Sequence, residues 1–282
     1  MRITTRFAPS PTGPLHLGHA FSALLANDMA RASEGVFLLR IEDIDQGRAR
    51  DHWERQIYDD LTWLGLRWPQ PVMRQSERMS RYAAALIELE ALGLTYPCRC
   101  KRADIELAAG APQEGVPHFG PDGRIYPGTC RTRPMSDRKA GDVIRLNIAQ
   151  AAALHPNLDF KETAPRHIGR HRISPETLCR EVGDIVLVRR QMGSSYHLSV
   201  VVDDADQGIT HVTRGEDLFD ATQIHVLLQH LLGLPTPIYH HHRLVRDEAG
   251  KRLAKRDDAR AIATYREAGK TPNGIRAMVG LA

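Results

Sequence analysis

Hydrophobic and polar positions near the amino terminus predict a strand, a loop, a helix and a second strand. Residues 3–7 form a short apolar pattern, the Pro- and Gly-rich run APSPTGP follows, and apolar residues at helical spacing mark a helix over 18–32. A compact apolar strand over 36–41 comes directly afterwards. This order is a βαβ unit, so we expect a parallel sheet with a ligand at the carboxyl end of its first strand.

The pattern then predicts packing helices and an irregular insertion. Apolar residues recur at three-to-four spacing over 51–64 and 77–92, which is typical of helices packed on a core. Between 97 and 138 this periodicity gives way to Cys, Gly, Pro and basic residues, so we expect an insertion with its own local scaffold. Apolar strands are predicted over 143–148 and 185–188.

The last third of the chain looks like a second α/β half. It contains the segment 196–203, a strand-like run over 209–213 and a helical pattern over 221–232, and after 243 it becomes basic and then weakly helical. No internal repeat or low-complexity tract interrupts the sequence, so we predict one compact catalytic body.

Composition favours a soluble globular protein. The 282 residues are 42% hydrophobic, enough to bury a substantial core. The sequence has no apolar stretch of bilayer-spanning length and no secretory signal, so we expect a cytoplasmic protein without a membrane partner. Four cysteines, including the close pair Cys98 and Cys100, are too few for a disulfide framework, which favours reduced thiols or metal ligands.

Charge is nearly balanced, but basic residues gather in two segments. The sequence has 38 Lys and Arg against 34 Asp and Glu, a formal charge of +4 that is mild for a nucleic-acid-binding protein. Residues 161–172 and 243–260 are rich in Lys and Arg, and both are candidates for phosphate contacts. The plainer interpretation is a solvated surface, which charge runs usually form.

The most informative run is RFAPSPTGPLHLGH at residues 6–19, which brings His16 and His19 to a helix start. A phosphate there meets unpaired backbone N–H groups and the positive end of the helix dipole, and Gly18 lets a nucleotide approach the backbone. The two imidazoles are then candidate donors to the α-phosphate as negative charge develops. The simpler interpretation is a pair of helix-capping histidines, since HxxH alone is short and degenerate.

This run resembles the HIGH signature of the class I aminoacyl-tRNA synthetases, with His16, Gly18 and His19 in the signature positions. FAPSPTG before the signature and LRIEDID at residues 39–45 are similar to the glutamyl branch of that class. The resemblance implies that His16 and His19 are catalytic and that they bind ATP together with Gly18.

The second signature of the class, KMSKS, resembles RLAKR at residues 252–256. Arg252 and Ala254 depart from the signature, and only Lys255 carries over as the ammonium that follows the pyrophosphate charge. The resemblance implies that Lys255 is catalytic and binds ATP, which is a substrate with Mg²⁺. A solvated basic loop is the alternative for this segment taken alone.

The resemblance also implies a glutamate pocket. Glutamate carries two carboxylates and an ammonium, so its site needs guanidinium groups and an acid or hydroxyl. A site with paired guanidiniums favours glutamate over glutamine, which would leave buried positive charge unpaired. For an isolated Arg214, a surface ion pair with Glu216 or Asp217 is the alternative. The residues matched to the glutamate site are Arg6, Ala8, Ser10, Glu42, Tyr196 and Arg214.

Two further clusters invite interpretation. The acids Asp203, Asp204 and Asp206 are candidates for holding Mg-ATP or for capping the next turn. The run His240–His242 is a tempting metal cluster, but on a strand only alternate residues share a face, so metal binding there is disfavoured.

The insertion carries the pattern of a zinc site. Cys98 and Cys100 lie on one side of it and Cys130 on the other, so three thiolates are available for a tetrahedral ion. The truncated glutamyl family binds zinc with CxC followed by YxxxC, which nominates Tyr126 as the fourth ligand. One structural zinc per chain is therefore implied, with unligated cysteines as the alternative. We expect Cys179 to be a buried thiol.

The fold implied is α/β: a class I Rossmann-type parallel sheet with a zinc-containing insertion and a short C-terminal helical segment. We expect the first catalytic half over 1–95, an acceptor-binding-like insertion over 96–190 and the second half over 191–242. The KMSKS-like loop and helical segment would occupy 243–282, with no anticodon-binding domain, because the chain ends soon after Arg256.

A chain without the anticodon-binding half resembles the truncated branch of the family, which transfers glutamate to the queuosine base at the wobble position of the aspartate tRNA. The implied partners are L-glutamate, ATP and the queuosine-containing anticodon stem-loop of tRNA(Asp), and the protein is expected to be a monomer. Three alternatives stay open: a shortened enzyme that charges the tRNA 3′ end, a non-catalytic paralogue that binds glutamate or RNA, and a small-molecule adenylyltransferase.

Overall fold

The computed structural model describes residues 2–108, 118–246 and 260–281. The KMSKS-like segment 252–256 lies outside the described residues, and so does Lys255. Within the described part, no helix has the length and apolar character needed to cross a bilayer.

The predicted βαβ unit is confirmed. Strand β1 (Thr4–Phe7), helix α1 (Leu17–Ala32) and strand β2 (Val36–Ile41) follow one another, and β1 and β2 pair in parallel. The turn before β2 needs Gly35, because a Cβ there would lie 1.9 Å from the carbonyl oxygen of Ile3. The short strand β3 (Met73–Arg74) extends this parallel sheet beyond β2.

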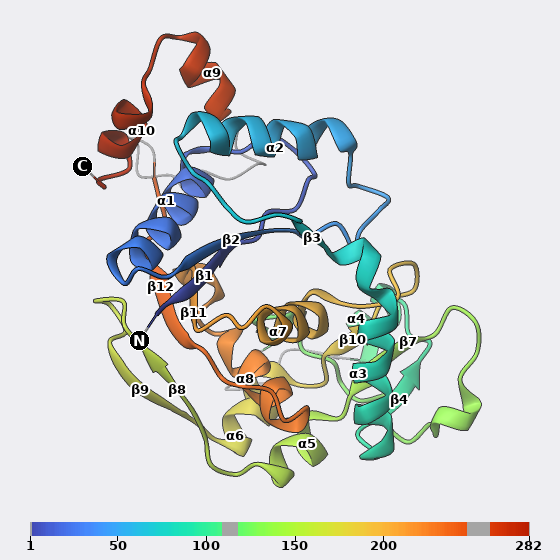
Figure 1. Cartoon of the computed structure of the whole chain (residues 1–282). Coiled ribbons are helices and arrows are strands. Elements are labelled where there is room, and N and C mark those ends of the chain that lie inside the picture. Colours follow the sequence, from blue (N-terminus) through green and yellow to red (C-terminus); the bar gives the residue numbers. More distant parts are fainter. Residues whose placement is uncertain (1, 109–117, 247–259, 282) are drawn as a thin grey trace.

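The second α/β half lies beside the first. Helix α7 (Tyr196–Asp206), strand β11 (His211–Gly215), helix α8 (Thr222–Leu231) and strand β12 (Ile238–His242) build it, and β11 and β12 are parallel. The Thr210 N–H donates to the Thr4 carbonyl, which places β1 next to β11. Figure 1 shows α1 and α2 on one side of β1 and β2, and α7 and α8 on the other.

The two faces of β2 explain this layering. Phe37, Leu39 and Ile41 face one hydrophobic core with α1, whereas Leu38 packs against the core built by α7 and α8. The packing helices are α2 (Asp51–Trp63) and α3 (Met79–Ala91), close to their predicted positions. A single turn of 3-10 helix, Gln75–Arg78, leads into α3.

The basic segment 161–172 belongs to a hairpin. Strands β8 (Leu158–Glu162) and β9 (Gly169–Ile173) pair antiparallel, and β8 also contacts β12, so the hairpin extends the second sheet. At the C-terminal end, α9 (Ile262–Glu267) and α10 (Pro272–Met278) complete the fold, with Arg276 paired to Asp28 of α1.

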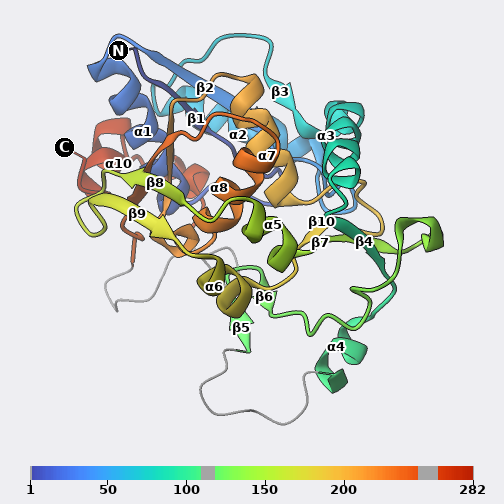
Figure 2. The same cartoon turned by 90° about the horizontal axis from the view of Figure 1, so that it is seen from below.

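The insertion has its own sheet, away from α1 and α10 (Figure 2). Strands β4 (Thr95–Cys98), β7 (Val143–Leu146) and β10 (Val186–Val188) pair antiparallel, and β5 (Phe119–Gly120) and β6 (Gly123–Arg124) form a hairpin. The predicted strand over 143–148 is wrong at its end, because the Asn147 side chain caps α5 (Ile148–Leu154). The remaining short helices are α4 (Arg102–Ala108) and α6 (Pro175–Thr177).

Candidate functional site

A pocket of about 380 Å³ opens where β1, β2, β11 and β12 end. Ligands of open α/β sheets bind at this carboxyl edge. Ser10 lines an adjoining cavity that shares Glu42 and Tyr196 with the pocket. The pocket brings together eight of the residues predicted for glutamate and ATP: Arg6, Ala8, His16, Gly18, His19, Glu42, Tyr196 and Arg214.

The two signature histidines cap α1, as the simpler interpretation held. Nδ1 of His16 accepts the backbone N–H of Gly18, and Nδ1 of His19 accepts the backbone N–H of His16, each at 3.1 Å. Because each Nδ1 is an acceptor, each neutral ring carries its proton on Nε2. Capping and phosphate binding therefore do not compete: the cap fixes both rings at the pocket wall with Nε2–H as the second polar group.

Arg214 reaches the pocket from β11 and is 6% exposed. Its Nε donates to Nε2 of His241 at 3.0 Å, and one Nη donates to Nδ1 of His225 at 2.8 Å. The other Nη donates to the hydroxyl of Thr222 at 2.7 Å. Burial lowers the pKa of His241 to about 4, and burial followed by the charge of Arg214 lowers the pKa of His225, so both histidines are neutral at pH 7.

No carboxylate among the described residues forms an ion pair with Arg214. Glu216 pairs instead with Arg166, so the interpretation of Arg214 as a surface ion pair with Glu216 or Asp217 is wrong. The reason is burial, which turns the guanidinium inward to the histidines of α8 and β12. A buried cation with only neutral acceptors is an unusual arrangement that favours an anionic ligand in the pocket.

The other described cation that lines the pocket, Arg6, is already paired. Its Nε and one Nη bond both carboxylate oxygens of Asp204, at 3.0 and 3.2 Å. Fully buried Arg40 donates to Asp204 at 2.7 Å and to Glu42 at 3.0 Å. Burial raises the pKa of Glu42, and the charge of Arg40 opposes that shift. Arg40 thus holds the Glu42 carboxylate at the pocket wall.

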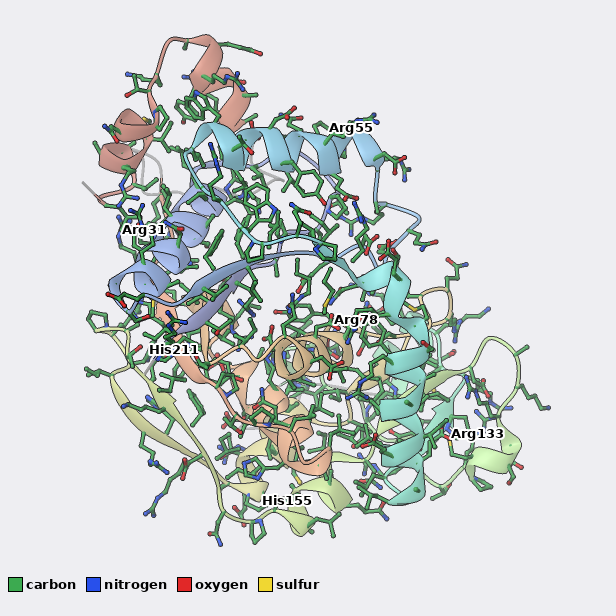
Figure 3. The ribbon with its side chains drawn as sticks, in the orientation of Figure 1. Arg31, Arg55, Arg78, Arg133, His155 and His211 are labelled. Atoms are coloured by element: carbon green, nitrogen blue, oxygen red, sulfur yellow. The ribbon has the colours of Figure 1, made fainter. Side chains whose placement is uncertain are left out.

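The acidic cluster on α7 serves this network. Asp203 is fully buried and accepts from Arg78 at 2.7 Å and from the hydroxyl of Tyr82 at 2.8 Å. Figure 3 shows Arg78 at the start of α3, facing α7. The exposed end of the cluster, Asp206, pairs with Arg81 at 3.0 Å. The carboxylates of Asp203 and Asp204 therefore tie elements together, and neither they nor Asp206 line the pocket as Mg-ATP ligands would.

Sequence reasoning missed three residues that organise the pocket: Arg40, His225 and His241. The charge of Arg40 inside the apolar strand VFLLRI was the available signal, since a buried cation needs partners. His241 belongs to the run 240–242 that drew attention as a metal cluster. Its ring contacts Arg214 and Glu162, whereas His242 lines the pocket.

The predicted metal ligands meet in the insertion. The sulfurs of Cys98, Cys100 and Cys130 lie within 4.8 Å of one another, and Cys100 and Cys130 are 3.6 Å apart without a disulfide. The hydroxyl of Tyr126 is 3.3 Å from Cys98 and 3.4 Å from Cys100. Sulfurs around a tetrahedral zinc are separated by about 3.8 Å, so this donor set fits zinc.

Cys179 lies apart from this cluster, and the prediction of a buried thiol is wrong for it. It is exposed because the helical turn Leu178–Val182 buries Leu178 and Val182 and leaves Cys179 facing solvent.

A pocket at the carboxyl edge of a parallel sheet, with the amino terminus of a helix at its wall, is the arrangement with which α/β proteins bind nucleotides. The family model of class I tRNA synthetases (E and Q), catalytic domain, matches residues 2–282. The chain belongs to this family and is a ligase.

Similar proteins agree with this family. A glutamyl-Q tRNA(Asp) synthetase of Rhodobacter capsulatus is 61% identical over 282 residues, covering 99% of this chain and 100% of the relative. One of Nocardia farcinica is 44% identical, covering 97% and 82%. A solved glutamate tRNA ligase of Elizabethkingia meningosepticum, in complex with its amino acid, matches with a TM-score of 0.78 and 27% identity; the match covers all of this chain and 61% of that one.

Proposed function

We propose that this ligase activates L-glutamate with ATP to glutamyl-adenylate without tRNA, and transfers the glutamyl group to the queuosine base of tRNA(Asp). The observation that supports glutamate as the substrate is Arg214, a buried guanidinium in the pocket with only neutral acceptors around it. The side-chain carboxylate of glutamate supplies the missing negative charge, whereas the side-chain amide of glutamine is neutral.

The other pocket residues complete the amino-acid site. Glu42, held by Arg40, accepts the substrate ammonium, and Tyr196 lines both cavities. The α-carboxylate then attacks the α-phosphorus of ATP and pyrophosphate leaves. His16 and His19 donate from Nε2 to the phosphate oxygens, and Gly18 lets the nucleotide lie against the backbone. Enzymes of this class use ATP with Mg²⁺, which neutralises the phosphate charge.

The acceptor is supported by the relatives named glutamyl-Q tRNA(Asp) synthetases. A hydroxyl of the queuosine cyclopentene ring attacks the adenylate carbonyl, and AMP leaves. Exposed cations on the β8 and β9 hairpin are the candidates for contacts with the RNA backbone, so binding would weaken with salt. These cations are Lys161, Arg166, Arg170 and Arg172.

We expect glutamate-dependent exchange of pyrophosphate into ATP in the absence of tRNA. Labelled glutamate should then attach to queuosine-containing tRNA(Asp) and stay attached after the 3′ terminal adenosine is trimmed. The same tRNA with unmodified guanosine should accept none. If trimming removes the label, or if glutamate tRNA is the better acceptor, the enzyme charges tRNA ends and the proposed acceptor is wrong.

The cysteine cluster is proposed as a structural zinc site. Cys98, Cys100 and Cys130 would supply thiolates, and Tyr126 would supply a phenolate oxygen. The guanidinium carbon of Arg145 lies 3.8 Å from the centre of the Tyr126 ring. The core around them is small, with only Tyr96 buried beside the ligands among the described residues, so a metal would supply much of its stability.

Cys98→Ser should remove the metal and lower the thermal stability of the protein. Elemental analysis of the wild type is expected to give about one zinc per chain. The matched control is Cys179→Ser, the same change at an exposed cysteine outside the cluster, which should keep both the zinc and the melting temperature. Native protein of full stability without zinc would contradict the site.

A further inference from the structure

The neutral partners of Arg214 continue into longer hydrogen-bond chains. Arginine has donors only, so Nδ1 of His225 must accept from Arg214 and the proton of its neutral ring lies on Nε2. That Nε2 is 3.0 Å from Nδ1 of His197, and Nε2 of His197 is 3.2 Å from a carboxylate oxygen of Asp122. A carboxylate accepts only, so every hydrogen in this chain has one consistent direction.

A second, shorter chain ends in the same way. Nε2 of His241 accepts from Arg214, and its Nδ1 donates to the buried carboxylate of Glu162. Burial alone would raise the pKa of Glu162, but the hydrogen bonds from His241 and from the Ala164 backbone lower it to about 2. Arg214 is therefore held by two histidines. Glu162 fixes the tautomer of His241 directly, and Asp122 fixes that of His225 through His197.

The two chains differ in where they end. Glu162 belongs to β8, a strand of the same sheet that carries Arg214, whereas Asp122 lies in the turn between β5 and β6 of the insertion. Figure 2 shows this hairpin next to α6. Asp122 also lines a separate cavity of about 550 Å³ with four arginines: Arg102, Arg124, Arg145 and Arg189.

We infer that Asp122, His197 and His225 form a positioning arm through which the insertion orients Arg214 in the amino-acid pocket. The inference rests on the proposed glutamate activation. His225 occupies one Nη of the guanidinium, and His197 keeps His225 in the tautomer that accepts from Arg214. Burial alone would raise the pKa of Asp122, but the hydrogen bond from His197 and the nearby charge of Arg189 lower it.

Replacing Asp122 should raise the KM for glutamate and leave the KM for ATP nearly unchanged. Without Asp122, Nε2 of His197 has no other described hydrogen-bond acceptor, so the His197 ring can change tautomer. The proton of His225 can then move to the nitrogen that faces Arg214 and displace the guanidinium. We expect Asp122→Ala to raise the KM for glutamate about tenfold in pyrophosphate exchange. The kcat and the KM for ATP should change by less than about twofold, since the chain does not reach His16 or His19.

Two variants separate positioning from a general structural effect. Asp122→Asn keeps an oxygen that accepts from His197 and should restore most of the glutamate affinity. Asp142→Ala removes another half-buried acid of the insertion, one that pairs with Arg133 at 2.9 Å and has no path to Arg214, and should leave the KM for glutamate unchanged. An equal rise for Asp142→Ala, or no rise for Asp122→Ala, would overturn the arm.

Nitrogen NMR of histidine-labelled protein tests the same arm without any substrate. In the wild type, His197 and His225 should both carry the proton on Nε2, and Asp122→Ala should shift the His225 resonances, assigned by their loss in His225→Phe. Unchanged resonances would contradict the arm. Absence of glutamate-dependent exchange in the wild type would refute the proposed function instead. The NMR result would still show whether Asp122 sets the tautomer of His225.

Discussion

Arg214→Ala is expected to lower kcat/KM for glutamate about 10³-fold in pyrophosphate exchange. Arg214 is the one pocket cation for which the structure describes only neutral acceptors, so the substrate carboxylate loses its charged partner and His225 and His241 lose their donor. Arg214→Lys keeps the charge but loses the planar fork of donors, and a loss of about 10²-fold is expected.

The control for this change is Arg180→Ala, an exposed arginine paired only with Glu181 among the described residues. It should leave both kinetic constants at wild-type values. If Arg214→Ala kept wild-type affinity for glutamate, or gained glutamine as an equal substrate without losing glutamate, the substrate would be bound elsewhere in the pocket.

His16→Asn and His19→Gln should each lower kcat of activation about 10²-fold while the protein stays folded. Asn is a strong N-cap residue and Gln at the third helical position completes a capping box, so both variants preserve the helix start. What they remove is the imidazole Nε2–H at the pocket wall. Pyrophosphate exchange measures the rate, and thermal unfolding measures the cap.

If both stable variants activated glutamate at the wild-type rate, the two histidines would serve only as helix caps. His16→Ala gives the opposite contrast, because it removes the cap and the donor together. It should lower the free energy of unfolding by about 1 kcal/mol, and with it the melting temperature, as well as the rate of activation.

Elements with a clear period were predicted within a few residues. The strand over 36–41 matches β2, since its apolar run is bounded by Gly35 and by the polar residue Glu42. Within the insertion, the predicted strands over 143–148 and 185–188 match β7 and β10. Their arrangement was not predicted, because β7 pairs with β4 on one side and with β10 on the other, and both partners are distant in sequence. The apolar pattern of a strand indicates that it is buried but not which strand pairs with it.

The site divides in the same way. The residues of the glutamate and ATP sites were found through the resemblance, and the pocket brings eight of them together, although their roles stay predictions. The residues that hold them were not found, because His225 and His241 are separated from Arg214 by turns and helices and nothing in their local sequence indicates a shared partner. Their importance depends on which donors the fold brings to them.

Strand β9 forms the open edge of its sheet, and Arg170 and Arg172 stand exposed on it. An uncovered strand edge is a template for pairing with another chain, and closely spaced cations discourage that pairing by repulsion and solvation. We therefore expect these arginines to discourage self-association, and they are also candidates for RNA contact. Replacing both with apolar residues to weaken RNA binding would also invite aggregation, so glutamine is the safer replacement, with light scattering measured alongside the binding curve.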